Sequence, residues 1–293
     1  APSPALLLVI AHPDDECMFF GPTLNALQRS GWPGSSSGLS SSPARSVVDV
    51  YVLCLTNGDA DGLGRRRASE LRHSCSLLGV PYTRVRLVDD ARIRDGMGVV
   101  WDRSVVAGLV GEAVRAWGLL DDSDDSGLRI VTFDDYGVSG HANHRSVHAG
   151  VRWYCKGVGG VELWVLRSSW LVVKYMGCVS WVAEPCAWWV AAVLAWAGSA
   201  VMDVAAPETS RVCWNVDVRR VWRAMACHAT QLTWWVLKSD RRALARPDSI
   251  SHTRLLAHSL AHSCCALLVC QVALLFVFLS QYSTLNRLVR VEN

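Results

Sequence analysis

The sequence predicts an α/β fold, built on a doubly wound, mostly parallel β-sheet and followed by an apolar C-terminal part. Two observations predict the sheet. Short apolar runs with the length of buried strands alternate with longer helical segments through residues 1–150, and no hairpin turn joins one run to the next. Clusters of His and Asp follow the ends of two runs, and ligands of open parallel sheets bind beyond the carboxyl ends of the strands.

The first predicted element is a buried strand over Leu6–Ile10, which leads directly into HPDDE at residues 12–16. Pro13 disfavours a helical conformation of the residue before it and ends the strand sharply. Several charges beside a core strand are costly unless a cation or a substrate compensates them. In the simpler alternative, Asp14 or Asp15 only caps the next helix.

The next elements continue the alternation. We expect a helix over Pro22–Arg29, a flexible Ser- and Gly-rich surface insertion at 33–43, and a second strand over Val47–Leu55. A polar, Gly-rich loop follows that strand at the same edge of the sheet as the HPDDE segment. A helix over 65–78 then ends before Gly79 and Pro81.

A short third strand is predicted over Val85–Val88, a helix over Trp101–Trp117 and a fourth strand over Ile130–Phe133. The fourth strand delivers Asp134 and Asp135 to the same edge of the sheet. These elements complete the alternation that is typical of a doubly wound sheet.

A second polar cluster, GVSGHANH, occupies residues 137–144. His141 and His144 are three residues apart and share one face if the segment is helical, and the glycines allow close approach of the backbone to a ligand. On their own they could be two surface histidines of a loop. With His12 and Asp15 at a neighbouring strand end, they supply the His and carboxylate donors of a hydrolytic zinc site.

Composition restricts the class of protein. Of the 293 residues 51% are apolar and 19% are charged, and the net charge is +3, so charge gives no indication of a nucleic-acid partner. The eleven cysteines are scattered without zinc-finger spacing. Buried, reduced thiols in a reducing compartment are therefore the preferred interpretation.

The C-terminal half contains two uncharged runs of 17 residues, at Cys186–Met202 and at 264–280. Both lie at the lower length limit for crossing a bilayer. Each run could also be a membrane-dipping hairpin, an interfacial helix or a core helix. We expect membrane contact somewhere within 161–293.

AHPDDE after a buried strand, followed by TFD and GVSGHxNH, resembles the zinc-dependent N-acetylglucosaminyl-phosphatidylinositol (GlcNAc-PI) de-N-acetylases, a family of the LmbE-like deacetylase superfamily. The resemblance implies a Rossmann-like, LmbE-like fold. It also implies that His12, Asp15 and His144 bind Zn²⁺, although another divalent transition metal such as iron(II) or cobalt(II) would accept the same ligands.

The resemblance further implies catalytic roles. Asp14 would be the general base, and His141 would stabilise the oxyanion or act as the acid. Asp134, in TFD, would orient an active-site histidine. Arg67, in the helix after the second strand, would contact the phosphate or sugar of the substrate, with a solvated helix face as the alternative. The family often has an acidic residue where Arg65 stands.

ACH at 226–228, with Gln231, resembles a further family signature, in which His228 lines the site or is structural. We expect a deacetylase domain over 1–232, with insertions at 33–43 and 178–202. An apolar extension would follow over 233–293, with 264–280 as a membrane segment. Phe278–Leu288 resembles the C-terminal tail of the family.

The implied reaction removes the N-acetyl group of the glycolipid GlcNAc-PI, giving glucosaminyl-phosphatidylinositol and acetate, an early step of GPI-anchor synthesis. The implied location is the endoplasmic reticulum membrane, with the catalytic domain facing the cytoplasm. One alternative is a soluble zinc deacetylase of a small N-acetyl amino-sugar conjugate. Another is a non-catalytic binding module that keeps the fold.

Overall fold

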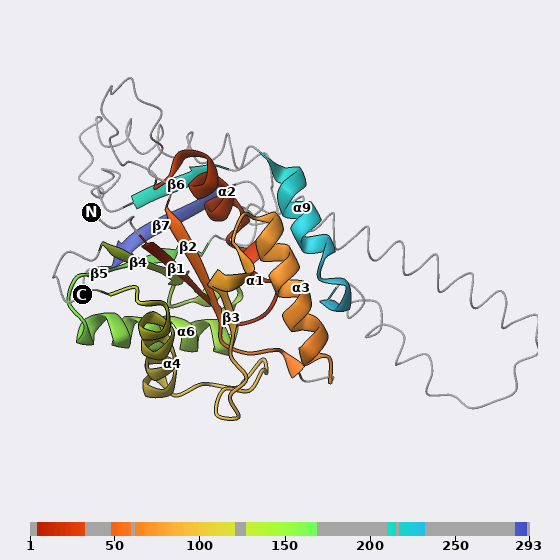
Figure 1. The fold of residues 1–293 in the computed structure, drawn as a ribbon. Coiled ribbons are helices and arrows are strands. Elements are labelled where there is room, and N and C mark those ends of the chain that lie inside the picture. Colours follow the sequence, from red (N-terminus) through yellow and green to blue (C-terminus); the bar gives the residue numbers. More distant parts are fainter. Residues whose placement is uncertain are drawn as a thin grey trace, which may run out of the picture.

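A seven-stranded sheet forms the centre of the structure, a computed structural model that describes residues 5–32, 48–59, 62–120, 127–168, 210–214, 217–231 and 285–291. The strands are β1 (Ala5–Ile10), β2 (Asp49–Cys54), β3 (Val85–Leu87), β4 (Leu128–Phe133), β5 (Val161–Leu166), β6 (Ser210–Trp214) and β7 (Leu285–Val291). Their order across the sheet is β3-β2-β1-β4-β5-β7-β6 (Figure 1). The first five strands are mutually parallel, and β7 is antiparallel to both β5 and β6.

β1 is a central strand of the sheet, with the parallel strands β2 and β4 on either side. All six of its residues are buried, and Leu6 pairs with Val50 of β2 on one side and with Arg129 of β4 on the other. A strand with both faces covered needs a continuous apolar run rather than an alternating one, and this explains the sequence ALLLVI.

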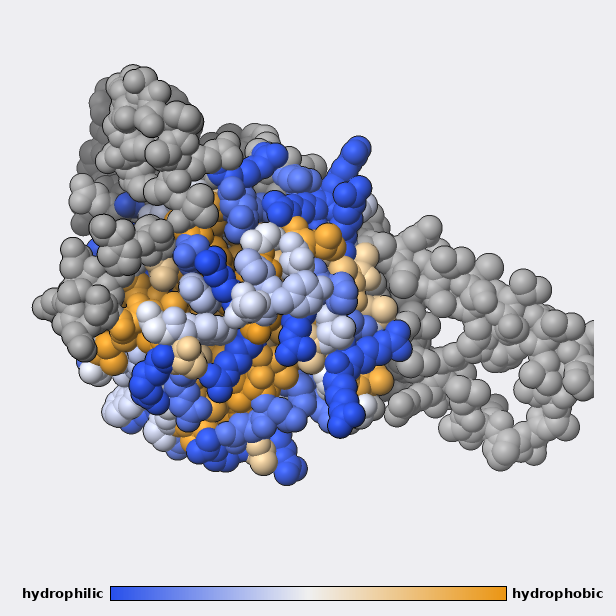
Figure 2. Space-filling view, in the orientation of Figure 1, coloured by the Kyte–Doolittle hydropathy of each residue, from blue (hydrophilic) through white to orange (hydrophobic). Residues whose placement is uncertain are grey.

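Helices cover both faces of the sheet (Figure 1). They are α1 (Asp15–Met18), α2 (Gly21–Ser30), α3 (Gly64–Leu77), the 3₁₀ turn η2 (Tyr82–Arg84), α4 (Arg103–Trp117), α5 (Gly137–Gly140), α6 (Ala142–Gly157) and α9 (Val218–Ala226). α4 and α6 pack together on one side, whereas α9 packs on α3 and α1 on the other. Figure 2 shows that the described surface on the side of α3 and α9 is mostly hydrophilic, with hydrophobic side chains visible between the helices.

Local sequence signals explain where the helices begin and end. Asp102 caps α4 by accepting a hydrogen bond from the backbone N–H of Ser104 at 2.7 Å, and Gly118 closes the helix with φ 60°. Asp217 caps α9 in the same manner, accepting from the N–H of Arg220 at 3.2 Å. The predicted α/β class, the parallel sheet and the order of the elements up to β4 are confirmed.

The C-terminal end of the chain takes part in the same sheet. Strand β7 lies between β5 and β6, with Val165 paired to Val289 and Cys213 to Asn286. Leu285–Val291 therefore belongs to the central sheet rather than to a separate extension. For the rest of 233–293, the predicted division stays a prediction.

The predicted insertion at 33–43 and both uncharged runs, 186–202 and 264–280, lie outside the described residues. Within the described ranges, no helix has the length and apolar character needed to cross a bilayer. The six described cysteines are free, and all but Cys227 are buried, as expected for reduced thiols.

Candidate active site

Backbone N–H groups just before Asp15 fix its carboxylate at the end of β1. Its Oδ2 accepts hydrogen bonds from the N–H groups of Ala11 at 3.0 Å and His12 at 2.8 Å, and the residue is 2% exposed. Its Oδ1 lies 3.4 Å from Nε2 of His144. Asp14 occupies the N-cap position of α1, but its side chain makes no capping hydrogen bond. The capping alternative therefore does not account for either carboxylate.

His144 reaches the same point from α6. Its Nδ1 lies 3.1 Å from the carbonyl oxygen of Gly137, which fixes the tautomer and leaves Nε2 free toward Asp15. The imidazole stacks on Phe133 with 4.1 Å between ring centroids. Gly137 has φ +68°, and a Cβ there would lie 2.8 Å from Cβ of His144, so this close approach requires glycine.

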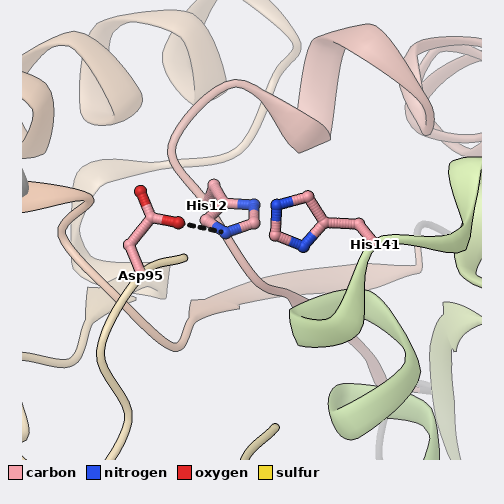
Figure 3. Close-up of side chains that lie close together, drawn as sticks. All are labelled: His12, Asp95 and His141. Carbon is pink, nitrogen blue, oxygen red and sulfur yellow. Dashed lines mark ion pairs between the residues drawn. The ribbon is translucent and has the colours of Figure 1, made fainter. Parts of the chain in front are cut away.

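His12 completes the group from the loop after β1. Its Nδ1 lies 3.3 Å from Nε2 of His144 and 3.7 Å from Oδ2 of Asp15. Its Nε2 lies 3.1 Å from Oδ1 of Asp95 and 3.1 Å from Oδ1 of Asn143. Figure 3 shows the imidazole between Asp95 and His141. The two acceptors at Nε2 orient the ring so that Nδ1 faces the carboxylate of Asp15 and Nε2 of His144.

The donor atoms of His12, Asp15 and His144 lie within 4.8 Å of one another, and they are the chemistry that a divalent transition metal prefers. His12 also belongs to a second, half-buried group with Asp95 and His141, whose donor atoms lie within the same 4.8 Å of one another. The first group fits a metal better, because each ligand's other polar atom already has a partner in the protein.

The carboxylates of the site favour positive charge at His12. Burial alone would lower the pKa of His12, but hydrogen bonding to Asp95 and the charge of Asp15 outweigh it and raise this pKa to about 9. Burial would raise the pKa of Asp15, but the neighbouring His144 and His12 hold it below its usual value. The pKa of Asp14 is raised to about 7, mainly by burial and then by the charge of Asp15.

Asp14 has a backbone conformation that is rare for a residue with a side chain, φ 133° and ψ −23°. Its N–H donates to Oε2 of Glu16 at 3.0 Å. The other oxygen of this fully buried carboxylate lies 2.7 Å from Nε2 of His228 and accepts a hydrogen bond from the hydroxyl of Ser74. His228 is therefore buried behind the HPDDE loop, where it supports Glu16.

His141 stands at the N-terminus of α6. Its Nδ1 accepts a hydrogen bond from the N–H of Asn143 at 3.2 Å, so Nε2 remains available to a ligand. The ring centroid lies 4.9 Å from that of His12 and 5.0 Å from that of His144. Partial burial and the two neighbouring imidazoles lower the pKa of His141 to about 4.

Asp134 holds the loop before α6. Its Oδ1 accepts from the N–H of Gly137 at 2.9 Å and from the hydroxyl of Ser168 at 2.7 Å, and its Oδ2 accepts from the N–H of Ser168 at 2.6 Å. Within the described residues these bonds include no histidine. Asp134 reaches His144 only through Gly137, whose carbonyl oxygen orients the imidazole.

Arg67 lies on the inner face of α3. It is 5% exposed, and its Nη1 donates to the carbonyl oxygen of Gly58 in the loop after β2. Its Nε is buried and has no hydrogen-bond partner within the described part of the chain, whereas the neighbouring Arg65 and Arg66 are exposed. The alternative that Arg67 belongs to a solvated helix face is therefore wrong.

A half-open hollow of about 500 Å³ lies beside this loop at the edge of the site. Polar side chains dominate its lining, which comprises Thr56, Asn57, Asp59, Asp89, Asp90, Ala91, Ile93, Arg94 and Asp95. Because Asp95 also contacts His12, the hollow adjoins the candidate metal ligands. Carboxylates and amides around such a hollow can accept and donate hydrogen bonds to sugar hydroxyls.

Sequence reasoning did not assign three residues that shape this centre, namely Asp95, Asn143 and Glu16. Asn143 and Glu16 lie inside the two motifs, and their exposed fraction of 0% sets them apart from solvated polar residues. Asp95 lies in a polar loop that also contains Asp89 and Asp90, and no local signal distinguishes it from them.

Comparisons with known proteins place the chain in a family. The sequence profile of the PIG-L family, described as GlcNAc-PI de-N-acetylase, matches residues 34–155. The N-acetylglucosaminyl-phosphatidylinositol de-N-acetylase of Bos taurus is 32% identical over 232 residues, which cover 78% of this chain and 75% of that protein. The chain belongs to the GlcNAc-PI de-N-acetylase family.

Other relatives match shorter stretches. A probable GlcNAc-PI de-N-acetylase of Schizosaccharomyces pombe is 34% identical over 59% of this chain, and the match spans 60% of that protein. A 1D-myo-inositol 2-acetamido-2-deoxy-alpha-D-glucopyranoside deacetylase of Actinosynnema mirum is 30% identical over 50% of this chain and 52% of that protein. Among solved structures, the zinc inhibited form of teicoplanin deacetylase Orf2 resembles the chain at 13% identity, with a TM-score of 0.47 and 99% of each chain covered.

Proposed function

We propose that this member of the GlcNAc-PI de-N-acetylase family hydrolyses the N-acetyl amide of GlcNAc-PI, giving glucosaminyl-phosphatidylinositol and acetate. One observation carries the proposal. His12 Nδ1, Asp15 Oδ1 and His144 Nε2 converge at the carboxyl end of β1, and each ligand is oriented by a separate partner. This is the arrangement that metal-dependent amide hydrolysis needs.

The metal we propose is zinc, held by His12, Asp15 and His144, with iron(II) or cobalt(II) as the metals that would accept the same donors. A bound zinc ion would lower the pKa of a coordinated water to about 7 and polarise the amide carbonyl. The hydrogen bonds from His12 to the oxygens of Asp95 and Asn143, and from His144 to the carbonyl oxygen of Gly137, keep the ligand atoms aimed at one point.

Asp14 and His141 carry the proton transfers in this proposal. Asp14 adjoins the ligand Asp15 in the chain, and its partly buried carboxylate would take the proton of the attacking water as general base. His141 presents Nε2 beside the ligand imidazoles, where its N–H would stabilise the oxyanion of the tetrahedral intermediate. It would act as the acid toward the leaving amine after taking up the proton that Asp14 removed from the water. Asp134 would act as a positioning residue through Gly137.

Arg67 would bind the phosphate or the sugar of the substrate. Its guanidinium is buried at the edge of the site, and among the described residues its one hydrogen bond is from Nη1 to the carbonyl oxygen of Gly58. We expect Arg67→Lys to raise KM for GlcNAc-PI about 10-fold or more with a smaller change in kcat, because an ammonium cannot reproduce the planar fork. Steady-state kinetics test this, with the exposed Arg66→Lys as the matched control; equal KM values for the two variants would remove Arg67 from substrate binding.

We propose the endoplasmic reticulum membrane as the location, with the catalytic domain facing the cytoplasm and the membrane surface as a partner. The eukaryotic relatives that bear the GlcNAc-PI name support this proposal. No nucleic-acid partner is proposed. The second candidate function is deacetylation of a small, soluble amino-sugar conjugate, which the similarity to the Actinosynnema mirum deacetylase favours.

The two candidates are separated by measuring acetate release by the full chain from vesicle-borne GlcNAc-PI and from water-soluble N-acetylglucosaminyl-inositol. The proposal predicts a higher kcat/KM for the glycolipid. A clear preference for the soluble conjugate would replace the proposed substrate but keep the deacetylase chemistry. No acetate from either compound would contradict both candidates.

A further inference from the structure

The loop between β3 and α4 carries an exposed apolar segment next to the candidate site. Met97 is 75% exposed, Val99 41% and Val100 78%, although all three are apolar. We call residues 97–100 the apolar tip. In the lower part of Figure 2, where this loop lies, hydrophobic side chains reach the surface among hydrophilic ones. Contiguous apolar residues with a polar rim are typical of an interaction surface.

The apolar tip is held in its exposed position by anchors on both sides. Ile93 before it is 1% exposed and Trp101 after it is 3% exposed. The indole N–H of Trp101 donates to the carbonyl of Arg94 at 2.8 Å, and its backbone N–H donates to the hydroxyl of Ser146 at 2.9 Å. Since the flanks are fixed in the core, the tip cannot bury its side chains by folding back.

One side chain couples the apolar tip to the candidate metal ligands. The amide of Asn143 accepts from the N–H of Gly96 at 3.2 Å and donates to the carbonyl of Val99 at 2.8 Å. The same Oδ1 lies 3.1 Å from Nε2 of His12, which also contacts Asp95 at the base of the loop. Any surface that the apolar tip binds would therefore lie at a defined position relative to His12.

The composition of the loop matches a lipid interface better than a protein surface. A stable protein interface buries about 800 Å² per partner, which is far more than three exposed side chains can supply. Interfacial membrane binding instead gains free energy for each apolar side chain that leaves water. The flanking Arg92 and Arg94 are both exposed, and Arg92 also pairs with Asp90. Guanidinium groups beside an apolar tip suit the phosphate level of a bilayer.

We propose that the apolar tip enters the interfacial region of a phospholipid bilayer and turns the edge that bears His12 toward the lipid head groups. The inference rests on the proposed function, because the sugar of a glycolipid must reach the site while the lipid chains stay in the bilayer. It extends that function by assigning the surface that docks and the residues that insert, Met97 and Val100 above all.

The test uses the full chain and the double variant Met97→Ser/Val100→Ser. The matched control is Leu77→Ser/Tyr82→Ser, which replaces two side chains, 41% and 47% exposed, at the end of α3 and in η2. Deacetylation is measured on GlcNAc-PI in phosphatidylcholine vesicles containing phosphatidylinositol, and on a water-soluble, deacylated form of the same substrate. Any other membrane-binding segment is identical in all three proteins and does not affect their comparison.

For the tip variant, we expect kcat/KM on vesicles to fall about 10-fold, with kcat/KM on the soluble substrate unchanged and the control unchanged on both. The loss should persist at 1 M salt, where charge interactions are screened beyond about 3 Å. Equal vesicle activity of tip variant and wild type overturns the proposal, and so does an equal loss on the soluble substrate. If the wild type deacetylates neither substrate, the proposed function fails, and vesicle co-sedimentation of the three proteins decides on the tip by itself.

Discussion

Asp14→Asn should lower the turnover of GlcNAc-PI by about 10²-fold or more while the zinc content of the protein stays at the wild-type level. The amide keeps the size of the side chain but cannot accept the proton of the attacking water. Asp15, His12 and His144 keep their mutual contacts, because none of these contacts uses the side chain of Asp14. Metal analysis and single-turnover kinetics on the same preparation provide the two measurements.

Asp135→Asn is the matched control, since Asp135 is an exposed carboxylate next to Asp134 at the end of β4. We expect this control to retain wild-type turnover. An Asp14→Asn protein with normal turnover would remove Asp14 from the role of base. Loss of zinc together with turnover would instead show that Asp14 supports the metal ligands.

Glu16→Ala should have the largest effect on stability. Glu16 is fully buried, and the substitution would leave His228, also 0% exposed, without its ion-pair partner. Burial alone would lower the pKa of His228, but Glu16 raises it, so the pair is held in its charged form. Breaking a buried pair on one side costs about 3–5 kcal/mol. In a chain of this size, this corresponds to a fall in Tm on the order of 10 °C.

The same substitution should lower activity in the fraction that remains folded. The N–H of Asp14 would lose its acceptor, so its unusual backbone conformation would be held only from the carbonyl side, where the N–H of Met18 donates at 2.9 Å. Glu162→Ala is the control, because that carboxylate lies at the surface and pairs with Arg129 and Arg290. Thermal unfolding should show a change within about 1 kcal/mol for the control. Equal stability of the two variants would contradict the assigned role of Glu16.

Strands that are buried on both faces could be predicted from the sequence. β1, β2 and β4 appear as nearly continuous apolar runs, because helices cover both faces of the sheet at these strands (Figure 1). β7 could not be placed. It pairs with β5, which lies more than a hundred residues earlier in the chain, and such a long-range pairing leaves no local pattern.

The site residues that directly follow strand ends could be predicted from the sequence, whereas residues brought to the site by the path of a loop could not. His12, Asp15 and His144 meet because β1 and β4 are adjacent and parallel. The inward orientation of Arg67 has a sequence signal, since it shares a helical face with the buried Leu71. Asp95 has none, because its contact with His12 depends on the path of the loop after β3.

The most direct test of the account is acetate release from GlcNAc-PI by the purified full chain before chelation, after chelation and after zinc is added back. We expect the wild type to lose activity with the metal and to regain it when zinc is added, whereas His144→Ala, which lacks one ligand, should not regain activity at the same zinc concentration. Deacetylation that continues after complete removal of the metal would contradict the proposed role of His12, Asp15 and His144.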